Sequence, residues 1–163
     1  MVFFFGAKND NGYLSNWYPC EFSVDGVKFT SSEQFMMYYK ALLFGDMEIA
    51  NKILSTSNCK DIKALGRQVR GFDETMWNLN KKQIMYNGLL AKFSQNRDLA
   101  NKLISTGNKI LAEASPYDKV WGIGLSTKDN RRFDKNRWLG QNLLGEILMM
   151  VRYTLTNNNI RDN

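Results

Sequence analysis

The sequence predicts a mostly helical α+β domain with a small β-sheet. Apolar residues recur at helical spacing over several long segments, and one clear hairpin signal occurs near the N-terminus. No linker or change of composition divides the 163 residues, which suffice for one domain with a proper core but are few for two. We therefore expect one domain over residues 1–156, followed by a polar C-terminal tail over residues 157–163.

Four segments have the composition of strands. Residues 2–5 form a short apolar run that ends at a glycine, which is typical of a buried strand. Residues 21–24 and 27–30 alternate apolar and polar side chains around an Asp-Gly pair, which predicts a β-hairpin. Residues 110–114 are a further expected strand.

Helix signals account for most of the remaining chain. A hydroxyl residue caps the first helix, Asp46 and Asp73 cap two others, and Gly66 is expected to end the third. Residues 126–137 are polar and basic, which is typical of a mobile surface segment. The predicted helices cover about residues 31–41, 46–54, 60–65, 73–93, 98–104 and 138–155.

The residue types present restrict the chemistry. The sequence contains no histidine, which excludes Ser-His and Cys-His nucleophile pairs, histidine zinc sites and a histidine general base. Proton transfer would therefore fall to Asp, Glu, Lys, Tyr or Cys. Cys20 and Cys59 lack metal-type spacing, and without secretion we expect no disulfide between them.

Charge and hydropathy indicate the setting. The net charge of +6 favours an anionic or phosphorylated partner, but the basic residues are spread along the chain. No apolar run approaches the ~20 residues of a membrane span. The first residues also lack the basic and long apolar regions of a signal peptide. We therefore expect a cytoplasmic protein with no membrane partner.

The segment 31–41 places an acid and an amine on one helical face. Glu33 and Lys40 are separated by nearly two turns, or about 10 Å along the axis, which is too far for a direct ion pair. Phe, Met and Tyr residues lie between them, so most of this helix should be buried. The two charges can therefore face each other across a ligand. The alternative is a core helix whose charges reach out to water.

Residues 115–124 are the second informative segment. Trp121 is followed by Gly122 and Gly124, which allow a backbone to approach a ligand closely or to turn tightly. Asp118 lies just before them, and its alternative role is to cap a turn. The Gly-x-Gly pattern alone is a weak signal because the fuller dinucleotide-binding pattern is absent.

Nine short blocks follow one another in an order typical of a known family. They are Tyr13-Leu-Ser-Asn-Trp-Tyr-Pro, Asp25-Gly-Val, Ser32-Glu-Gln-Phe, Tyr39-Lys-Ala, Leu65-Gly-Arg, Lys92-Phe-Ser-Gln-Asn, Thr106-Gly, Glu113-Ala-Ser-Pro-Tyr-Asp-Lys-Val-Trp-Gly-Ile-Gly and Trp138-Leu-Gly-Gln-Asn-Leu-Leu-Gly. In these blocks the chain resembles the YbiA-like family, also called NADAR for its association with NAD and ADP-ribose. The resemblance runs from about Phe3 to Tyr153, and the block beginning at Glu113 is the most specific.

The resemblance implies a YbiA-like domain and N-glycosidase chemistry that uses no cofactor or metal. Members are associated with cleaving phosphoribosylamino intermediates of riboflavin biosynthesis, and others with removing ADP-ribose from modified guanine in nucleic acid. Both substrates join C1 of a phosphorylated ribose to nitrogen. In both, breaking that bond gives an oxocarbenium-like transition state that a carboxylate can stabilise.

The resemblance also implies roles for individual residues. Glu33 is the first choice for the catalytic carboxylate, and Asp118 would hold ribose hydroxyls or share the acid–base role. Lys40 would bind phosphate, protonate the departing base, or attack C1 and pass through a Schiff base. The expected substrate-binding residues are Asn16, Trp17, Arg67, Trp77, Trp121, Gly122, Gly124 and Asn142. The tryptophans would stack on a base and Arg67 would reach phosphate, although Trp17 and Trp77 also suit the core and Arg67 a surface ion pair.

Three functions stay open at this point. The first is hydrolysis of an ADP-ribosyl or phosphoribosyl N-glycoside, and the basic charge favours ADP-ribosylated guanine in nucleic acid over a riboflavin intermediate. The second is a non-catalytic module that binds ADP-ribose or a nucleotide. The third is a helical interaction protein, which would bind no nucleotide at all.

Overall fold

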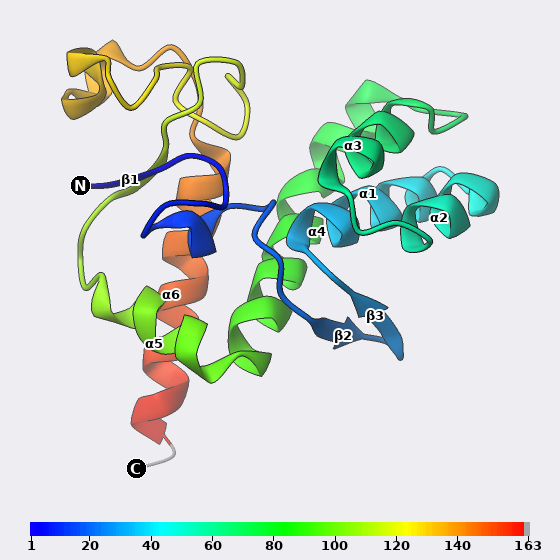
Figure 1. Ribbon diagram of the computed structural model, residues 1–163, viewed down its shortest axis with the longest axis horizontal. Helices are drawn as coiled ribbons and strands as arrows, with labels where there is room; N and C mark the ends of the chain where they lie inside the picture. The colour runs from blue at the N-terminus through cyan, green and yellow to red at the C-terminus, as the bar shows by residue number, and fades with distance from the viewer. Residues whose placement is uncertain (162–163) are drawn as a thin grey trace. The chain divides into compact units, whose positions relative to one another are not determined.

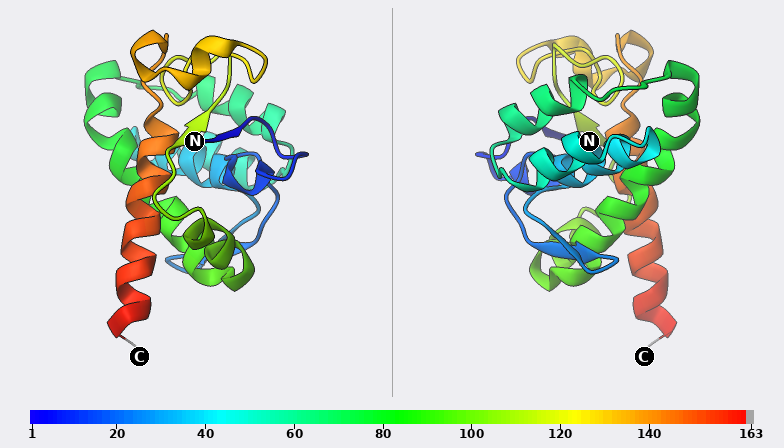
Figure 2. Two further views of the ribbon diagram at one scale, coloured as in Figure 1. Left: turned by 90° about the vertical axis from the view of Figure 1, so that its left-hand side faces the viewer. Right: turned by 90° about the vertical axis from the view of Figure 1, so that its right-hand side faces the viewer.

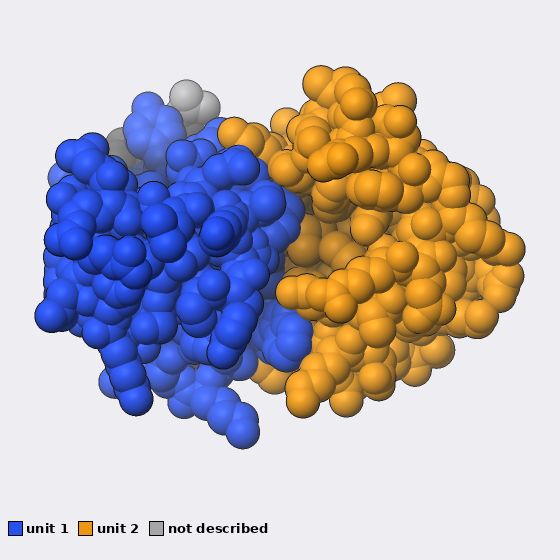
Figure 3. All heavy atoms as spheres, turned by 90° about the horizontal axis from the view of Figure 1, so that it is seen from above, with its two compact units in different colours: residues 1–18, 96–163 blue, residues 19–95 orange. Residues whose placement is uncertain are grey.

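The computed structural model describes residues 1–161, with side chains described to residue 157. Within residues 1–161 it contains six α-helices, three 3-10 helices and four short strands, so the predicted mostly helical α+β fold is confirmed. The chain groups into two compact units, shown in Figure 3. Unit 1 comprises residues 1–18 and 96–163, and unit 2 comprises residues 19–95. Unit 2 is an insertion between the two parts of unit 1, so no single point in the sequence marks a boundary, and the single domain over residues 1–156 stays a prediction.

Unit 1 contains a two-stranded parallel sheet. Strand β1 (Val2–Phe4) pairs with β4 (Leu111–Glu113), and Val2 lies opposite Leu111. Phe4, Leu111 and Ala112 are buried, as expected for short apolar strands. Both strand predictions are confirmed, and the pairing joins residues more than one hundred positions apart in the sequence.

One helix of unit 1 packs on this sheet, and a second helix packs on the first. Helix α6 (Leu143–Arg161) packs along β4 and against α5 (Arg97–Ser105) (Figure 2). A short 3-10 helix, η1 (Gly12–Leu14), lies just before Asn16 and Trp17. Two more, η2 (Asn130–Phe133) and η3 (Lys135–Arg137), lie between β4 and α6.

Two predictions about the C-terminal part of unit 1 need correction. The last helix begins at Leu143 and not at Trp138, because Asn142 has a left-handed backbone with φ of 56° that a helix cannot contain. Helix α6 continues to Arg161, into the segment expected as a tail. The last two residues of that tail, 162–163, lie outside the described residues.

Unit 2 begins with the predicted hairpin. Strands β2 (Phe22–Val24) and β3 (Val27–Phe29) are antiparallel, with Val24 opposite Val27. Asp25 and Gly26 have φ of 51° and 78°, the positive angles of a two-residue hairpin turn. The hairpin prediction from the Asp-Gly pair is therefore confirmed.

The rest of unit 2 is helical and is organised around α1 (Ser32–Leu43). Helix α1 contacts α2 (Met47–Leu54), α3 (Cys59–Arg67) and α4 (Glu74–Gln95), as Figure 1 shows. Phe29 and Phe35 are almost fully buried and their rings meet edge to face, with centroids 5.0 Å apart. An aromatic core therefore holds the hairpin against α1.

Gly66 has a different role from the predicted one. It lies within α3 and does not end it, since the helix continues through Arg67. A Cβ atom at this position would overlap the sulfur of Met37 on α1. Glycine therefore allows α1 and α3 to pack closely, at some cost in helix propensity.

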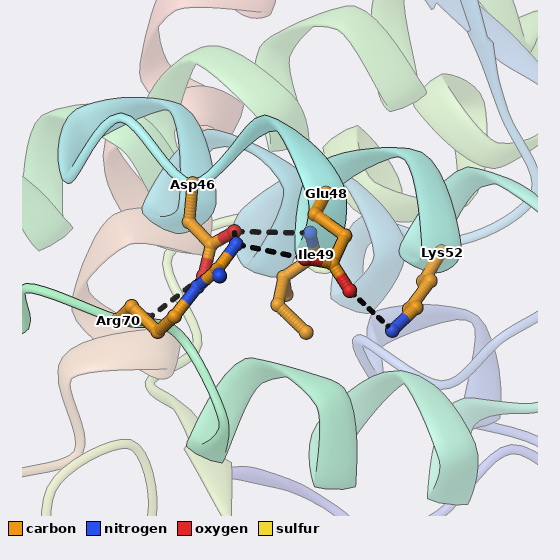
Figure 4. A network of polar contacts seen from close by, with 5 residues as sticks. All are labelled: Asp46, Glu48, Ile49, Lys52 and Arg70. Carbon is orange, nitrogen blue, oxygen red and sulfur yellow. Dashed lines mark hydrogen bonds and ion pairs between the residues drawn. The ribbon is translucent and has the colours of Figure 1, made fainter.

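A buried carboxylate ties the start of α2 to the loop after α3 (Figure 4). The side chain of Asp46 caps α2 by accepting a hydrogen bond from the backbone of Ile49, as predicted. Asp46 also accepts bonds from the backbone N–H of Arg70 at 2.9 Å and from two nitrogens of its guanidinium at 3.1 and 2.8 Å. Arg70 further reaches Glu48, which pairs with Lys52. The network anchors residues 68–73, the loop that leads into α4.

No helix formed by residues 1–161 is both long enough and apolar enough to cross a membrane.

Candidate functional site

The predicted site residues fall into two groups, one within each unit. Unit 2 contains Glu33, Lys40, Arg67 and Trp77. Unit 1 contains the other predicted residues, which are Asn16, Trp17, Asp118, Trp121, Gly122, Gly124 and Asn142.

Glu33 is a buried carboxylate in the first turn of α1, with 5% of its surface exposed. Ser31 is the N-cap residue, and its hydroxyl accepts a hydrogen bond of 3.1 Å from the backbone N–H of Gln34. The Gln34 side chain accepts a hydrogen bond from the backbone N–H of Thr30, just before the helix, and donates one to the backbone carbonyl of Thr56, which follows α2. These bonds hold the turn that carries Glu33, and a negative charge is favourable at a helix N-terminus.

A thiol lies in the surroundings of Glu33. Cys59, the first residue of α3, has its sulfur 3.6 Å from the Ser31 hydroxyl. Burial raises the pKa of the Cys59 thiol, and the negative charge of Glu33 raises it as well. The thiol is therefore held in its neutral form, which makes it a poor nucleophile.

Lys40 lies in the last turn of α1, and the structure brings it together with Arg67 and Trp77. Its Nζ donates a hydrogen bond of 2.7 Å to the carbonyl oxygen of Gly66 and lies 5.6 Å from the centre of a Trp77 ring. Burial lowers the pKa of Lys40, and the positive charge of Arg67 lowers it further. The two cations and an aromatic face are suited to bind a phosphorylated ligand that carries a flat base.

Phe72 was not predicted as a site residue, yet its ring covers the same amine. The Lys40 Nζ lies 4.6 Å from the ring centre of Phe72, which is 47% exposed and meets Phe44 edge to face. Phe72 belongs to the loop that the Asp46 network anchors. The sequence shows only an aromatic residue between Gly71 and the Asp73 helix cap, which does not by itself indicate a ligand.

Lys92 is a second buried amine that had no predicted role. It lies in α4 with no exposed surface, and burial lowers its pKa to about 8. Its Nζ lies 5.1 Å from the ring centre of Phe93, and Cys20 is close enough for its charge to affect the lysine. The signal was a lysine on the apolar side of a long helix, three positions after Leu89.

In unit 1, Asp118 organises the loop 115–124. One of its carboxylate oxygens accepts hydrogen bonds from the backbone N–H groups of Val120 and Trp121, at 2.9 and 2.8 Å. The turn-capping role considered from the sequence is therefore observed. The side chain is half-buried, so part of its surface can still contact a ligand.

The two glycines of this loop are buried and tightly enclosed. A Cβ atom on Gly122 would lie 2.9 Å from the carbonyl oxygens of Glu113 and Asp118, so no other residue fits without movement of the backbone. Gly124 has φ of 70°, in the left-handed region. The half-buried ring of Trp121 precedes them. The packing and backbone conformation of the loop itself therefore require both glycines.

Asn142 holds the loop to the sheet of unit 1. Its side-chain amide donates to the Leu111 carbonyl at 2.9 Å and accepts from the Glu113 N–H at 3.1 Å. Its backbone N–H donates to the Gly122 carbonyl at 3.0 Å. The amide proposed to bind substrate therefore has a structural role on strand β4.

Asn16 and Trp17 follow η1 in unit 1. Asn16 is 6% exposed, and Trp17 is half-buried with its backbone N–H bonded to the Ser15 hydroxyl at 3.2 Å.

Among residues 1–161, no group of three or more Cys, Asp or Glu side chains is arranged to hold a metal ion.

Comparison with known proteins identifies the family. A sequence profile described as the NADAR domain matches residues 3–156, almost the whole chain. The chain belongs to the NADAR domain family. The resemblance on which the sequence predictions rested is therefore confirmed.

Named relatives of this NADAR chain include N-glycosidases. An N-glycosidase of Acanthamoeba polyphaga mimivirus is 48% identical over 159 residues, which cover 93% of this chain and 94% of the relative. A riboflavin biosynthesis protein of Vibrio vulnificus is 32% identical over 94% of this chain, which matches 38% of that longer protein.

A solved NADAR structure confirms the fold. The NMR structure of the Escherichia coli protein YbiA is 27% identical, with a TM-score of 0.80 over 98% of this chain and 86% of YbiA. The YbiA-like α+β fold expected from the sequence is thus the fold of this NADAR chain.

Proposed function

We propose that this protein is an N-glycosidase that hydrolyses the bond between C1 of a phosphorylated ribose and a base nitrogen. The observation that carries the proposal is the pair of groups on α1, a buried Glu33 carboxylate and a desolvated Lys40 amine. The names of the mimivirus and E. coli relatives, both N-glycosidases, support the same reaction class.

In the proposed reaction, the C1–N bond breaks and its electron pair leaves with the base, so that positive charge develops on C1 and the ring oxygen. Glu33 would stabilise this charge or remove a proton from the attacking water. The water oxygen forms the new bond to C1, and the base nitrogen gains a proton.

Lys40 has two chemically distinct roles in this scheme. As a cation it would bind phosphate with Arg67 or protonate the departing base. As a neutral amine it would attack C1 while the bond to the base breaks. The bond between C1 and the ring oxygen then breaks, the ring oxygen takes up a proton, and the resulting iminium is hydrolysed by water to the free sugar and the free amine. Its lowered pKa favours the neutral form more than in an ordinary lysine.

For the substrate, we propose ADP-ribosylated guanine in nucleic acid. The net charge of +6 supports a polyanionic carrier of the modified base, and the aromatic faces of Phe72 and Trp77 suit a flat base or the adenine. Binding of a small metabolite would not require the net positive charge of the protein. A specific observation favours a second candidate, a phosphoribosylamino-pyrimidine, because the Vibrio vulnificus relative is a riboflavin biosynthesis protein.

Parallel hydrolysis assays by mass spectrometry test the proposal. One substrate is guanine-ADP-ribosylated single-stranded DNA and the other is the phosphoribosylamino-pyrimidine, each with wild type and Glu33→Gln. We expect release of ADP-ribose from DNA, lowered by orders of magnitude in Glu33→Gln with ligand binding retained. Cleavage of the pyrimidine alone would move the function to metabolite hydrolysis. A folded wild type that binds ADP-ribose but cleaves neither substrate would be a binding module.

A further inference from the structure

Residues 126–137 of unit 1 form the most basic segment of the chain, and nothing in the proposed reaction uses it. Its twelve residues include five basic and two acidic side chains. The sequence indicated a mobile segment, but the chain here is organised as the two 3-10 helices η2 and η3 (Figure 1, yellow and orange). The position of its charges is therefore set by local structure.

Both acidic residues are used within the segment itself. Asp129 caps η2 and forms a forked ion pair with Arg131, with contacts of 2.7 to 3.2 Å. Asp134 caps η3 by accepting from the backbone of Asn136. The hydrogen bonds of Arg131 lower the pKa of the Asp129 carboxyl to about 2, and the charge of Arg137 lowers it slightly further without an ion pair between the two residues. The carboxylates thus stabilise the fold of the segment and neutralise little of its outer charge.

Three cations of the segment point to solvent. Lys128, Lys135 and Arg137 are exposed, and none of them forms an ion pair with any residue in the part of the chain that the structure describes. Exposed cations on successive short turns are suited to a flexible polyanion, whose phosphates can follow them.

An exposed aromatic ring lies among these cations. Phe133 is 57% exposed, although its ring is packed at its edge against Phe3, with centroids 5.4 Å apart. The guanidinium of Arg132 lies 4.1 Å from the centre of the Phe133 ring and 5.4 Å from that of Phe3. The ring is therefore held in place while much of it faces water, as in the stacking platforms that bind unpaired bases.

The basic segment is tied to the loop 115–124 of the same unit. The indole N–H of Trp138 donates to the Arg132 carbonyl at 2.8 Å. The chain that follows runs beside the loop, with hydrogen bonds from Leu139 to Ile123 and from Gln141 to Lys119. A ligand bound to the segment would thus have a defined position relative to Asp118 and Trp121.

We propose that residues 126–137 form a contact surface for single-stranded nucleic acid. Lys128, Lys135 and Arg137 bind phosphates, and Phe133 stacks on an unpaired base. A duplex fits less well, because η2 and η3 are too short to enter a major groove and a stacking ring needs an unstacked base. An anionic membrane also fits less well, because the segment lacks the apolar face of an interfacial helix. The biological purpose of the surface rests on the proposed function, but the binding itself does not.

Fluorescence anisotropy with an unmodified, labelled single-stranded DNA tests the surface on the full chain. The triple variant Lys128→Gln, Lys135→Gln, Arg137→Gln should lower the affinity and reduce the slope of log K against log salt by about 2, because each lost phosphate contact contributes ~0.7. Phe133→Leu should lower the affinity about fivefold or more and leave the slope unchanged, because it removes stacking and no charge.

The matched control removes the same charge elsewhere. Lys28, Lys60 and Lys82 of unit 2 are also exposed, and the triple variant of these to Gln should keep the wild-type slope. An equal loss of slope in the control would show that only the net charge matters, and this would overturn the proposal. Binding to phosphatidylserine vesicles but not to DNA would overturn it in favour of a membrane surface.

Hydrolysis of the small phosphoribosylamino-pyrimidine separates this proposal from the proposed function. The segment variant should cleave it at the wild-type rate if the wild type cleaves it at all. Segment-dependent DNA binding without hydrolysis of any N-glycoside would refute the enzyme and keep the surface. If the wild type hydrolyses an N-glycoside and the segment variant binds DNA as tightly as the wild type does, only the proposed contact surface is refuted.

Discussion

The amine of Lys40 and the carbonyl oxygen of Gly66 are joined by a hydrogen bond of 2.7 Å. Gly66 lies in the last turn of α3, where carbonyl groups lack partners within the helix and carry partial negative charge. The bond therefore holds a long, flexible side chain at one position, close to the rings of Phe72 and Trp77. A reactive amine needs this kind of placement, because a lysine free in solvent loses much entropy when it is positioned.

The pH profile of Arg67→Gln should reveal which form of Lys40 acts. Removing the Arg67 charge should raise the pKa of Lys40, so the limb of the kcat profile that reports Lys40 should move to higher pH. If activity rises with pH on that limb, Lys40 acts as a neutral nucleophile. If activity falls with pH, it acts as a cation.

Arg67→Lys is the control for this measurement because it retains the charge and should leave the limb in place. Since Arg67 is exposed, the movement in Arg67→Gln should shrink as salt is added. A limb that stays at the same pH in Arg67→Gln at low salt would show that it reports another group.

Gly66→Ala should lower the free energy of unfolding by about 1–3 kcal/mol, because the added methyl group overlaps Met37 in a packed core. Chemical denaturation of the single and double variants measures this. In a Met37→Ala background the same change should cost less than about 1 kcal/mol, since the overlapping atoms are gone and Ala favours a helix. Equal costs in both backgrounds would contradict the assigned contact.

Asp46→Asn should make the stability of the protein depend less on pH under acidic conditions. The hydrogen bonds and charge of Arg70 hold the pKa of the Asp46 carboxyl well below its usual range in the folded protein. Its stabilising effect is therefore fully present above the unfolded pKa of about 3.9 and is lost as pH falls toward the folded value. Wild-type Tm should fall steeply between about pH 5 and pH 2, and less steeply in Asp46→Asn, which can still cap α2.

Glu48→Gln is the matched comparison, since Glu48 also bonds Arg70 but its side chain is 58% exposed. Its variant should follow the wild-type acid curve closely. If Glu48→Gln flattened the curve as much as Asp46→Asn, the buried carboxylate would not be the source of the acid sensitivity.

Asn142→Ala should destabilise the protein by about 2–4 kcal/mol. The change removes the side-chain partner of the Leu111 carbonyl and of the Glu113 N–H. It also places alanine, which lacks the polar side chain that helps asparagine adopt this conformation, at a backbone φ of 56°. Asn142→Gly should recover the backbone part of this loss but not the hydrogen-bond part. Denaturation would decide, because a residue used only for substrate would change KM and leave the free energy of unfolding unaltered.

Local signals predicted most of the fold. The hairpin followed from the Asp25-Gly26 pair, and the starts of α2 and α4 followed from Asp46 and Asp73, because turns and caps depend on the backbone within a few residues. The start of α6 was wrong for the opposite reason. Apolar spacing continues back to Leu139, but Asn142 takes a left-handed conformation to reach strand β4, which is distant in the sequence.

The candidate site was predicted unevenly. Glu33 and Lys40 could be chosen because seven positions place two side chains on one helical face, and the family resemblance gave them roles. Phe72 could not be chosen in this way. Its contact with Lys40 depends on the path of a loop that Asp46 and Arg70 hold, and no short-range spacing encodes that path.

By itself, the sequence determined the helical α+β class, the NADAR family and the absence of histidine chemistry, because these depend on composition, local spacing and matching motifs. Only the tertiary structure decided that Lys40 is held by Gly66 and covered by Phe72, and that Asn142 serves strand β4. These properties arise where segments far apart in the chain pack together, and burial and neighbouring charges there set how each side chain behaves.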